Sequence, residues 1–558
     1  MKKTIIRLSF LTAICAMTAL QGCSKFFDTC LDTNRTSETI KTERSSIWYF
    51  ANAFYTPINY GYNVIDNNLF ASASDEAQQT SAASDVIYFN NGMINQNVNP
   101  LSMYYNNYYE GIRAANYFLD FVADGKGEEL LAQNRNLITD ANNYKRDLAS
   151  LNWYIAEAHI ARAYYYSELI KMYGGVPIVE QTMQQNGGVM IPRSTYDEVV
   201  DYIVNEIDTW KGELAKDWSE FTEREGRFTL GTALAIKSRT LLYAASPLHN
   251  PEGDRSKWIK AAEAANEFLT CDEIEYSLDP EYDKYFIGSN SLASPETIYV
   301  VRRGTSNTLE VNNYPISTPG GKSGVCPTEN LVSSYEYIGT PNPTNPYANR
   351  DPRLEASIVT NNSTWNGRII AQAAGETDDM AKANASRTGY YLKKFLTDGL
   401  NLTQGQTAQH NWVMFRYAEI LLNYAEAVNE AFGPSVTPSG YVMSAKDALM
   451  QVRNRASINL PSVDASTIES FRNAVKHERR VELAFEDHRY WDLLRWKDAM
   501  KVLNEPVTGV KITKSGDEYR YDVVKVADRV FNQANYFLPF TRSEIENSKG
   551  TLEQNPNY

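Results

Sequence analysis

Apolar residues recur with the 3.6-residue period of a helix through much of the chain from about Trp48 onward. The clearest stripe consists of Leu151, Ile155, Ala158, Arg162, Tyr165, Leu169 and Met172. Gly174 and Gly175 follow this stripe and Pro177 lies just beyond them, which is a typical signal for a helix C-terminus. The pattern therefore predicts a long helix that ends at this glycine pair.

Four further stripes predict four more helices. They consist of Ala233, Ile236, Leu241 and Ala245; of Trp258, Ala261, Ala262, Ala265 and Leu269; of Val413, Tyr417, Leu421, Tyr424 and Val428; and of Ile468, Phe471, Val475, Glu478, Glu482 and Phe485. Alanines stand where paired helices would touch, among them Ala156, Ala161, Ala235 and Ala425. Such small–large alternation is typical of tetratricopeptide-type helix pairs. The regular W-x₂-L-G signature is absent, so any repeats are degenerate.

Residues 271–412 have a different pattern, because Gly and Pro are dense there and helical periodicity is weak. Only Thr297–Val301 has the composition of a strand. A second loop-rich stretch runs through residues 57–100. We therefore expect a mainly α fold, with helical parts at 43–270 and 413–558. Between them, residues 271–412 are expected to form a loop-rich part with short strands, where binding usually resides.

The first residues have the features of a targeting signal. Lys2, Lys3 and Arg7 precede an apolar stretch, Leu8–Leu20, that is too short to span a bilayer. Cys23 follows directly after a small residue, as in the signals that lipoprotein signal peptidase cleaves. We expect residues 1–22 to be removed, Cys23 to be lipidated, and residues 23–42 to form a tether to the outer membrane. The alternative is an ordinary secretory signal in which Cys23 is incidental.

The formal net charge is −14, and removal of residues 1–22 would make it −17, since three positive and no negative charges leave. An acidic surface repels phosphate backbones, so nucleic acid is not expected as a partner and a neutral ligand is favoured. Cys30, Cys271 and Cys326 would remain besides Cys23. An odd number of thiols without a C-x-x-C motif indicates neither a disulfide framework nor a zinc site.

The sequence contains no recognisable catalytic or cofactor motif, and its five histidines have no metal-ligand spacing. The densest charged run, residues 478–496, places Glu478, Glu482 and Glu486 one turn apart among arginines. Arginines at that spacing should lower the pKa values of the carboxylates, whereas the general acid of a glycosidase needs a raised one. We interpret this run as a buried or half-buried Arg–carboxylate network that joins two helices.

The same run resembles the C-terminal signature of the SusD/RagB family, surface glycan-binding lipoproteins of bacteria with two membranes. Further segments are similar to family motifs in the same order: Cys23–Asp28, Ser74–Glu76, Tyr104–Asn116, Glu157–Pro177, Asn349–Arg353, Arg416–Leu422, and Asn535–Phe540 with Gln554–Tyr558. The resemblance implies degenerate tetratricopeptide helix pairs that support a loop-rich ligand-binding half. It also implies a SusC-like TonB-dependent transporter as partner. The acidic run after the lipidated cysteine is missing, so the sequence leaves open which face of the outer membrane carries the protein.

Sugars present apolar faces and a rim of hydroxyls, which suit aromatic rings and amide, carboxylate or guanidinium groups. In the loops these residue types give the candidate ligand contacts Tyr60, Tyr62, Asp66, Tyr88, Asn90, Tyr314, Trp365, Arg368 and Tyr390, with Asn362 beside Trp365. Trp365 and Tyr88 are the favoured stacking rings, and Arg368 and Asn90 the favoured hydroxyl partners. No catalytic residue, metal site or cofactor is expected, although the sequence does not decide about calcium.

Two other functional classes remain open at this point. A lipid-anchored glycoside hydrolase would need two carboxylates that converge from different segments, one with a raised pKa. A helical-repeat scaffold that binds only proteins would not need the long loops of residues 271–412. The sequence names neither the glycan nor its linkage, and a peptide cargo is also open.

Overall fold

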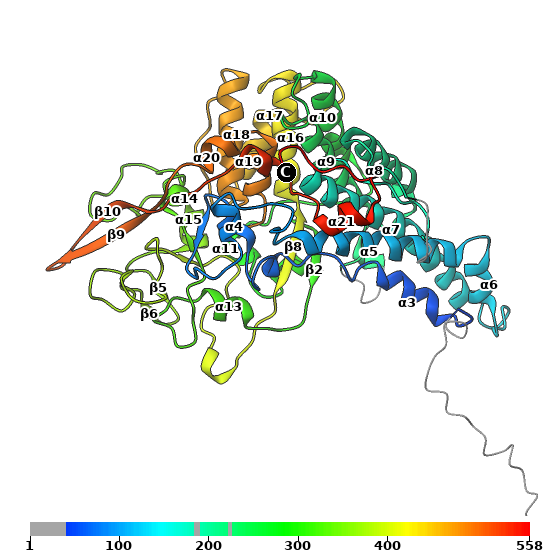
Figure 1. Cartoon of the computed structure of the whole chain (residues 1–558), viewed down its shortest axis with the longest axis horizontal. Helices are drawn as coiled ribbons and strands as arrows, with labels where there is room; N and C mark the ends of the chain where they lie inside the picture. Colours follow the sequence, from blue (N-terminus) through cyan, green and yellow to red (C-terminus); the bar gives the residue numbers. More distant parts are fainter. Residues whose placement is uncertain (1–40, 184–189, 221–225) are drawn as a thin grey trace, which may run out of the picture.

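The computed structural model describes residues 41–183, 190–220 and 226–558. The signal segment, Cys23, Cys30 and nearly all of the expected tether lie outside the described residues. The main helices are α3 (Ser45–Ala53), α5 (Ser102–Val122), α6 (Lys126–Ala132), α7 (Ala141–Tyr173), α8 (Tyr196–Trp210), α9 (Leu230–Ala245), α10 (Arg255–Thr270), α16 (Tyr417–Phe432), α17 (Ala445–Arg453), α18 (Ile468–Glu482) and α19 (Arg489–Arg495). They form one side of the molecule (Figure 1).

Local sequence explains several of the helix ends. The long stripe forms α7, which stops where Gly174 takes a positive φ of 73° that suits glycine. Capping boxes begin α8 at Thr195, α9 at Thr229 and α18 at Thr467. The predictions for α7, α9 and α10 are confirmed.

Helices close in chain order pack against one another, with contacts between α7 and α8, α9 and α10, α10 and α16, and α16 and α18. The alanines Ala156, Ala161, Ala235 and Ala425 are buried, so backbones approach closely at these contacts. Tyrosines supply much of the remaining core, among them Tyr108, Tyr164, Tyr165 and Tyr173. The result is a helical body made of pairs, as the small–large alternation predicted.

The other side of the molecule carries short elements linked by loops (Figure 1). Its strands form five antiparallel two-stranded sheets: β1 (Ala77–Gln79) with β3 (Val325–Pro327), β2 (Thr297–Arg302) with β8 (Asn411–Arg416), β4 (Ile358–Val359) with β7 (Tyr391–Leu392), β5 (Thr364–Trp365) with β6 (Arg368–Ile369), and β9 (Val507–Ser515) with β10 (Glu518–Ala527). The strand expected at Thr297–Val301 is confirmed as β2. Since β2 pairs with β8, most of the loop-rich part leaves and re-enters the helical body along one ribbon.

Short helices complete the fold. They are α4 (Ile87–Asn90), α11 (Tyr282–Tyr285), α12 (Asn290–Ala293), α13 (Thr308–Asn313), α14 (Glu329–Val332), α15 (Pro352–Ser357), α20 (Ala499–Val502) and α21 (Arg542–Asn547). Single 3₁₀ turns occur at Gly61–Asn63, Phe70–Ala73, Lys211–Glu213, Trp218–Glu220, Leu402–Gln404 and Gln533–Tyr536.

Two helix boundaries predicted from the stripes are wrong. Val413 belongs to strand β8, because it pairs with Val300 of β2, and the helix begins only at Tyr417. At the other stripe, α18 ends at Glu482 and Phe485 has a positive φ of 67°. There the free carbonyl oxygen of Glu482 accepts a hydrogen bond from Arg416, at 2.9 Å. In both places a partner distant in sequence satisfies the backbone and overrides the local period.

Candidate functional site

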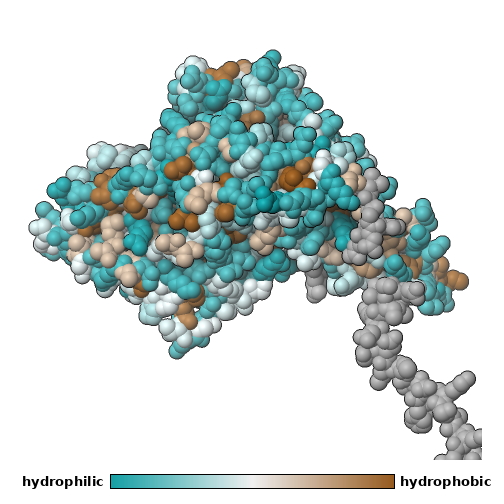
Figure 2. All heavy atoms as spheres, in the orientation of Figure 1, coloured by the Kyte–Doolittle hydropathy of each residue, from teal (hydrophilic) through white to brown (hydrophobic). Residues whose placement is uncertain are grey.

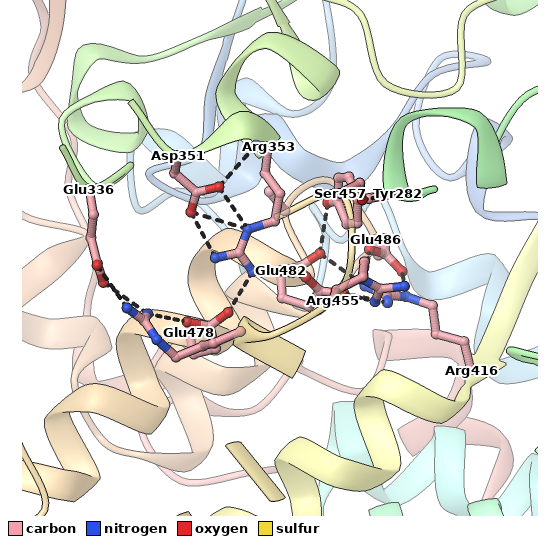
Figure 3. A network of polar contacts seen from close by, with 12 residues as sticks. Tyr282, Glu336, Asp351, Arg353, Arg416, Arg455, Ser457, Glu478, Glu482 and Glu486 are labelled. Atoms are coloured by element: carbon pink, nitrogen blue, oxygen red, sulfur yellow. Dashed lines mark hydrogen bonds and ion pairs between the residues drawn. The ribbon is translucent and has the colours of Figure 1, made fainter. Parts of the chain in front are cut away.

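The charged run, residues 478–496, contributes to a buried network of ion pairs (Figure 3). The Glu482 carboxylate lies 2.8 Å from Arg353 Nη1, 2.7 Å from Arg416 Nη1 and 2.7 Å from Arg455 Nη2. All four side chains are almost fully buried. One carboxylate on α18 therefore holds guanidinium groups from α15, from β8 and from the turn just after α17.

The neighbouring acids extend this network in both directions. Glu478 pairs with Arg353 at 2.5 Å and with Arg453 at 2.7 Å. Glu486 pairs with Lys394 at 2.7 Å and with Arg416 at 2.7 Å. Because Arg353 and Lys394 come from the loop-rich part, the network fixes that part to the helical body. The expected Arg–carboxylate network is confirmed.

The electrostatics of the network are those of a structural support. Burial raises the pKa of Glu482, but the nearby guanidinium groups of Arg455, Arg416 and Arg353 outweigh it and hold this pKa well below the ordinary value. Burial lowers the pKa of Lys394 to about 8 in spite of its contact with Glu486. A carboxylate with a lowered pKa remains ionised and does not donate a proton at neutral pH. Glu482 is therefore an anchoring charge.

A cavity of about 480 Å³ lies directly against this network, on the loop-rich side. We call it the asparagine cavity; its lining includes Asn345, Tyr347, Asn349, Arg350, Asp351, Pro352, Glu355, Thr360, Asn361, Asn362, Ser363, Thr364 and Lys393. Asp351 also forms an ion pair with Arg353 at 2.7 Å. The network thus supports one wall of the cavity.

The cavity is rich in amides, hydroxyls and tyrosine. Asn349 and Asn362 are exposed and have φ values of 57° and 66°, a left-handed conformation that asparagine tolerates better than most residues. The ring of Tyr347 is half-buried and contacts the rings of Tyr390 and Tyr521 edge to face, at 6.0 and 5.5 Å between centroids. The Tyr347 ring beside the exposed amides of Asn349 and Asn362 suits a ligand with apolar faces and a hydroxyl rim.

Four of the candidate rings named from the sequence are buried, which corrects their expected role as stacking platforms. Tyr62, Tyr314 and Tyr390 donate their hydroxyls to Asn411 O, Thr397 O and a Glu329 carboxylate oxygen. Trp365 is 3% exposed and packs edge to face against Tyr314. In loops of this length, apolar rings are needed to form a core, and these four rings serve that purpose.

The other candidates lie nearer the surface but not together in the asparagine cavity. Tyr60 is half-buried, with the Arg303 guanidinium 5.6 Å from its ring centre. Asp66 is exposed and accepts hydrogen bonds from the Ser84 hydroxyl and the Asp85 N–H, at 2.6 and 2.9 Å.

Tyr88 and Asn90 lie on α4 and are half-buried. Arg368 is half-buried on β6 and donates to the Thr318 hydroxyl at 2.6 Å. As ligand contacts, Tyr60, Asp66, Tyr88, Asn90 and Arg368 stay predictions.

Sequence reasoning missed most of the cavity lining. Tyr347, Asn349 and Lys393 were not among the candidates, and only Asn362 was named near this place. Asparagines are dense in residues 342–366, at Asn342, Asn345, Asn349, Asn361, Asn362 and Asn366, and this density was the available signal. Asn349 belongs to the segment Asn349–Arg353 that resembles a family motif, and this resemblance says nothing about ligand contact.

Comparisons with known proteins agree with this architecture. Residues 296–558 match the family model described as "SusD family", and residues 26–242 match a model described as "Starch-binding associating with outer membrane". Together the two models cover most of the chain. The chain belongs to the SusD/RagB family.

Known members of the family match this chain over most of their own length. A SusD-like protein of Bacteroides fragilis, solved as a crystal structure, superposes with a TM-score of 0.75 at 25% identity, covering 95% of this chain and 99% of that one. A SusD-like carbohydrate binding protein of the same species gives a TM-score of 0.74 at 23% identity, covering 91% and 99%. SusD-like protein P2 of Formosa agariphila is 23% identical over 447 residues, 76% of this chain and 77% of that protein.

Two kinds of feature are absent from the described ranges. Within residues 41–183, 190–220 and 226–558, no helix is both long enough and apolar enough to cross a bilayer. Over the same residues, His, Cys, Asp and Glu side chains form no group of three or more that could hold a metal ion.

Proposed function

We propose that this SusD/RagB protein is an outer-membrane lipoprotein, anchored through Cys23 and facing the cell surface. It captures an oligo- or polysaccharide and passes it to a SusC-like TonB-dependent transporter. Residues 271–412 provide the ligand-binding part, and the protein binds its glycan without cleaving it. Family membership supports the class, and the asparagine cavity is the observation that supports a glycan ligand.

The size and chemistry of the cavity fit this role. Its volume of about 480 Å³ lies within the ~300–1,000 Å³ range of ligand pockets. Amides of Asn349 and Asn362 can bind hydroxyl groups as donors and acceptors, and the Lys393 ammonium adds a donor. Uptake also requires release, so a dissociation constant in the millimolar to micromolar range is expected, roughly −4 to −8 kcal/mol.

A glycan array followed by calorimetry on the best ligand tests this proposal. Asn362→Gly removes the exposed amide and leaves a residue that accepts the positive φ, so affinity should fall about tenfold with the fold intact. Asn384→Gly is the matched control, because Asn384 is also exposed with a φ of 60° but does not line the cavity. Equal affinities for both variants, or no glycan bound at all, would refute the assignment.

The anchor is tested separately. Cells that express the chain with labelled palmitate should incorporate label into the protein, and Cys23→Ala should abolish this incorporation. Co-purification with a SusC-like transporter from the same cells would support delivery. A protein that is unlabelled but secreted would support the alternative in which Cys23 is incidental.

A further inference from the structure

Helix α3 has large aromatic residues on the face that points away from the core. Ile47 and Ala51 are buried on its inner face. Trp48 and Tyr49 are 59% and 63% exposed. The outer face of a surface helix is normally polar, so α3 departs from the usual pattern.

Two further exposed apolar side chains lie at the same end of the molecule, in the connection between α6 and α7. Leu137 is 47% exposed and Ile138 is 90% exposed. Helix α3 packs on α5 and α7, and α6 packs on the same two helices. Figure 1 shows α3 and α6 together at the end opposite the β9–β10 hairpin, and Figure 2 shows apolar side chains reaching its tip.

The position of this end in the chain suggests what covers it. The described chain begins at Lys41, just before α3, so the segment from Cys23 joins the molecule here. Residues 24–40 reach at most ~60 Å when fully extended. A lipid on Cys23 therefore keeps this end, more than any other part, close to a bilayer surface.

We propose that Trp48, Tyr49, Leu137 and Ile138, here called the aromatic end, rest on the membrane surface. This inference relies on the lipid anchor of the proposed function. Trp and Tyr favour the headgroup level of a bilayer, where the ring is apolar and the polar atom stays hydrated. Burial of Leu and Ile side chains below that level is favourable, because it removes apolar surface from water. The contact would orient the protein, with the asparagine cavity held away from the bilayer.

Charge is not what drives this contact. Exposed Lys41, Arg44 and Lys126 at this end are accompanied by exposed Glu128 and Glu129, so the two signs largely offset each other. Binding by the aromatic end should therefore depend little on salt or on anionic lipid, unlike a polybasic contact.

Tryptophan quenching by brominated lipid tests the proposal with the full lipidated chain in phosphatidylcholine vesicles. One of nine tryptophans, Trp48, should account for most of the bromolipid quenching. Trp48→Phe should reduce that quenching at least threefold. The control Trp258→Phe, which changes a half-buried tryptophan of α10, should leave it unchanged. Wild-type quenching in Trp48→Phe would overturn the proposal.

A second experiment tests the membrane contact independently of the lipid anchor. A hexahistidine tag replaces residues 1–23, ahead of all described residues, and binds the chain to nickel-chelating lipid in the same vesicles. Quenching through Trp48 in this sample supports the membrane contact of the aromatic end even where Cys23 carries no lipid.

A third experiment places a photo-crosslinking amino acid at position 49 in intact outer membranes, where it should label lipid. Labelling of a protein alone would show that a partner chain covers this end, and would refute the membrane contact.

Discussion

The helical body and the loop-rich part are stabilised in different ways. The body buries alanines and tyrosines at helix contacts and places a continuous set of ion pairs at its centre. The loop-rich part has sheets of only two strands and a few buried rings, and it is attached to the body through Arg353 and Lys394. A rigid support and an adaptable surface are thus kept apart in one chain.

This difference explains how one fold can serve many ligands. The ion pairs of Arg353 and Arg416 come from segments that resemble family motifs, and so does Asn349, whereas Asn345 and Asn362 of the cavity belong to no such segment. Substitutions in the cavity should alter binding with little effect on folding, and substitutions in the network should have the opposite effect. The following changes test that separation, beginning with the largest expected effect.

Glu482→Gln should destabilise the protein most. The change keeps the shape of the side chain but leaves the guanidinium groups of Arg353, Arg416 and Arg455 short of one buried negative charge. Loss of one partner in a buried network costs ~3–5 kcal/mol, measured as the free energy of unfolding in urea. Glu281→Gln, which removes an exposed partner of Lys284, should be indistinguishable from wild type. A Glu482→Gln loss below 1 kcal/mol would mean that the network is not the main support.

Trp365→Ala should destabilise the loop-rich part by about 3 kcal/mol, because it leaves a cavity in place of a buried indole ring. Its Nε1 is buried and has no hydrogen-bond partner within the described part of the chain, so Trp365→Phe should be tolerated. Calorimetry on Trp365→Phe should then give glycan affinity within twofold of wild type. A tenfold loss of affinity at unchanged stability would restore Trp365 as a sugar platform.

Glu76→Gln should change how stability depends on pH. Burial and, to a lesser extent, the Asp75 carboxylate raise the pKa of Glu76 to about 8 from an ordinary value of 4.5. Between these two values the folded chain retains a proton that the unfolded chain releases, so the free energy of unfolding falls as pH rises.

Gln carries no such proton. On going from pH 5 to pH 8, the free energy of unfolding of Glu76→Gln should therefore rise by about 2 kcal/mol or more relative to that of wild type. Urea unfolding at both pH values measures this gain. Parallel profiles for wild type and variant would show that Glu76 titrates normally.

Thr195→Ala should have the smallest effect, about 1 kcal/mol, because it removes only the capping box of α8 at the edge of the helical body. Thr195→Ser keeps the hydroxyl and should keep the stability. Glycan affinity should be unchanged in both variants. A loss of binding in Thr195→Ala would show that the two parts are coupled more tightly than their contacts indicate.

The candidate site was much harder to predict than the fold. Residue types suited to sugar binding were named in the loops, but four of the named rings are buried. Chemistry alone does not distinguish a ring that packs a loop from a ring that faces a ligand. Asn362 was named because it lies near Trp365, yet it lines the cavity because the fold brings residues 345–364 and Lys393 together around one space.

Spacing within a few turns was enough to predict α7, α9 and α10, the glycine that ends α7 and the charged network on α18, and a series of motifs in order indicated the family. Tertiary structure alone decided that Val413 pairs in a strand, that Trp365 is buried, and that Asn349 and Asn362 line one cavity. Each of these depends on a partner far away in the chain. Any segment of the chain can supply the backbone hydrogen bonds and the burial at such a place. A pattern of neighbouring residues therefore does not predict which segment does so.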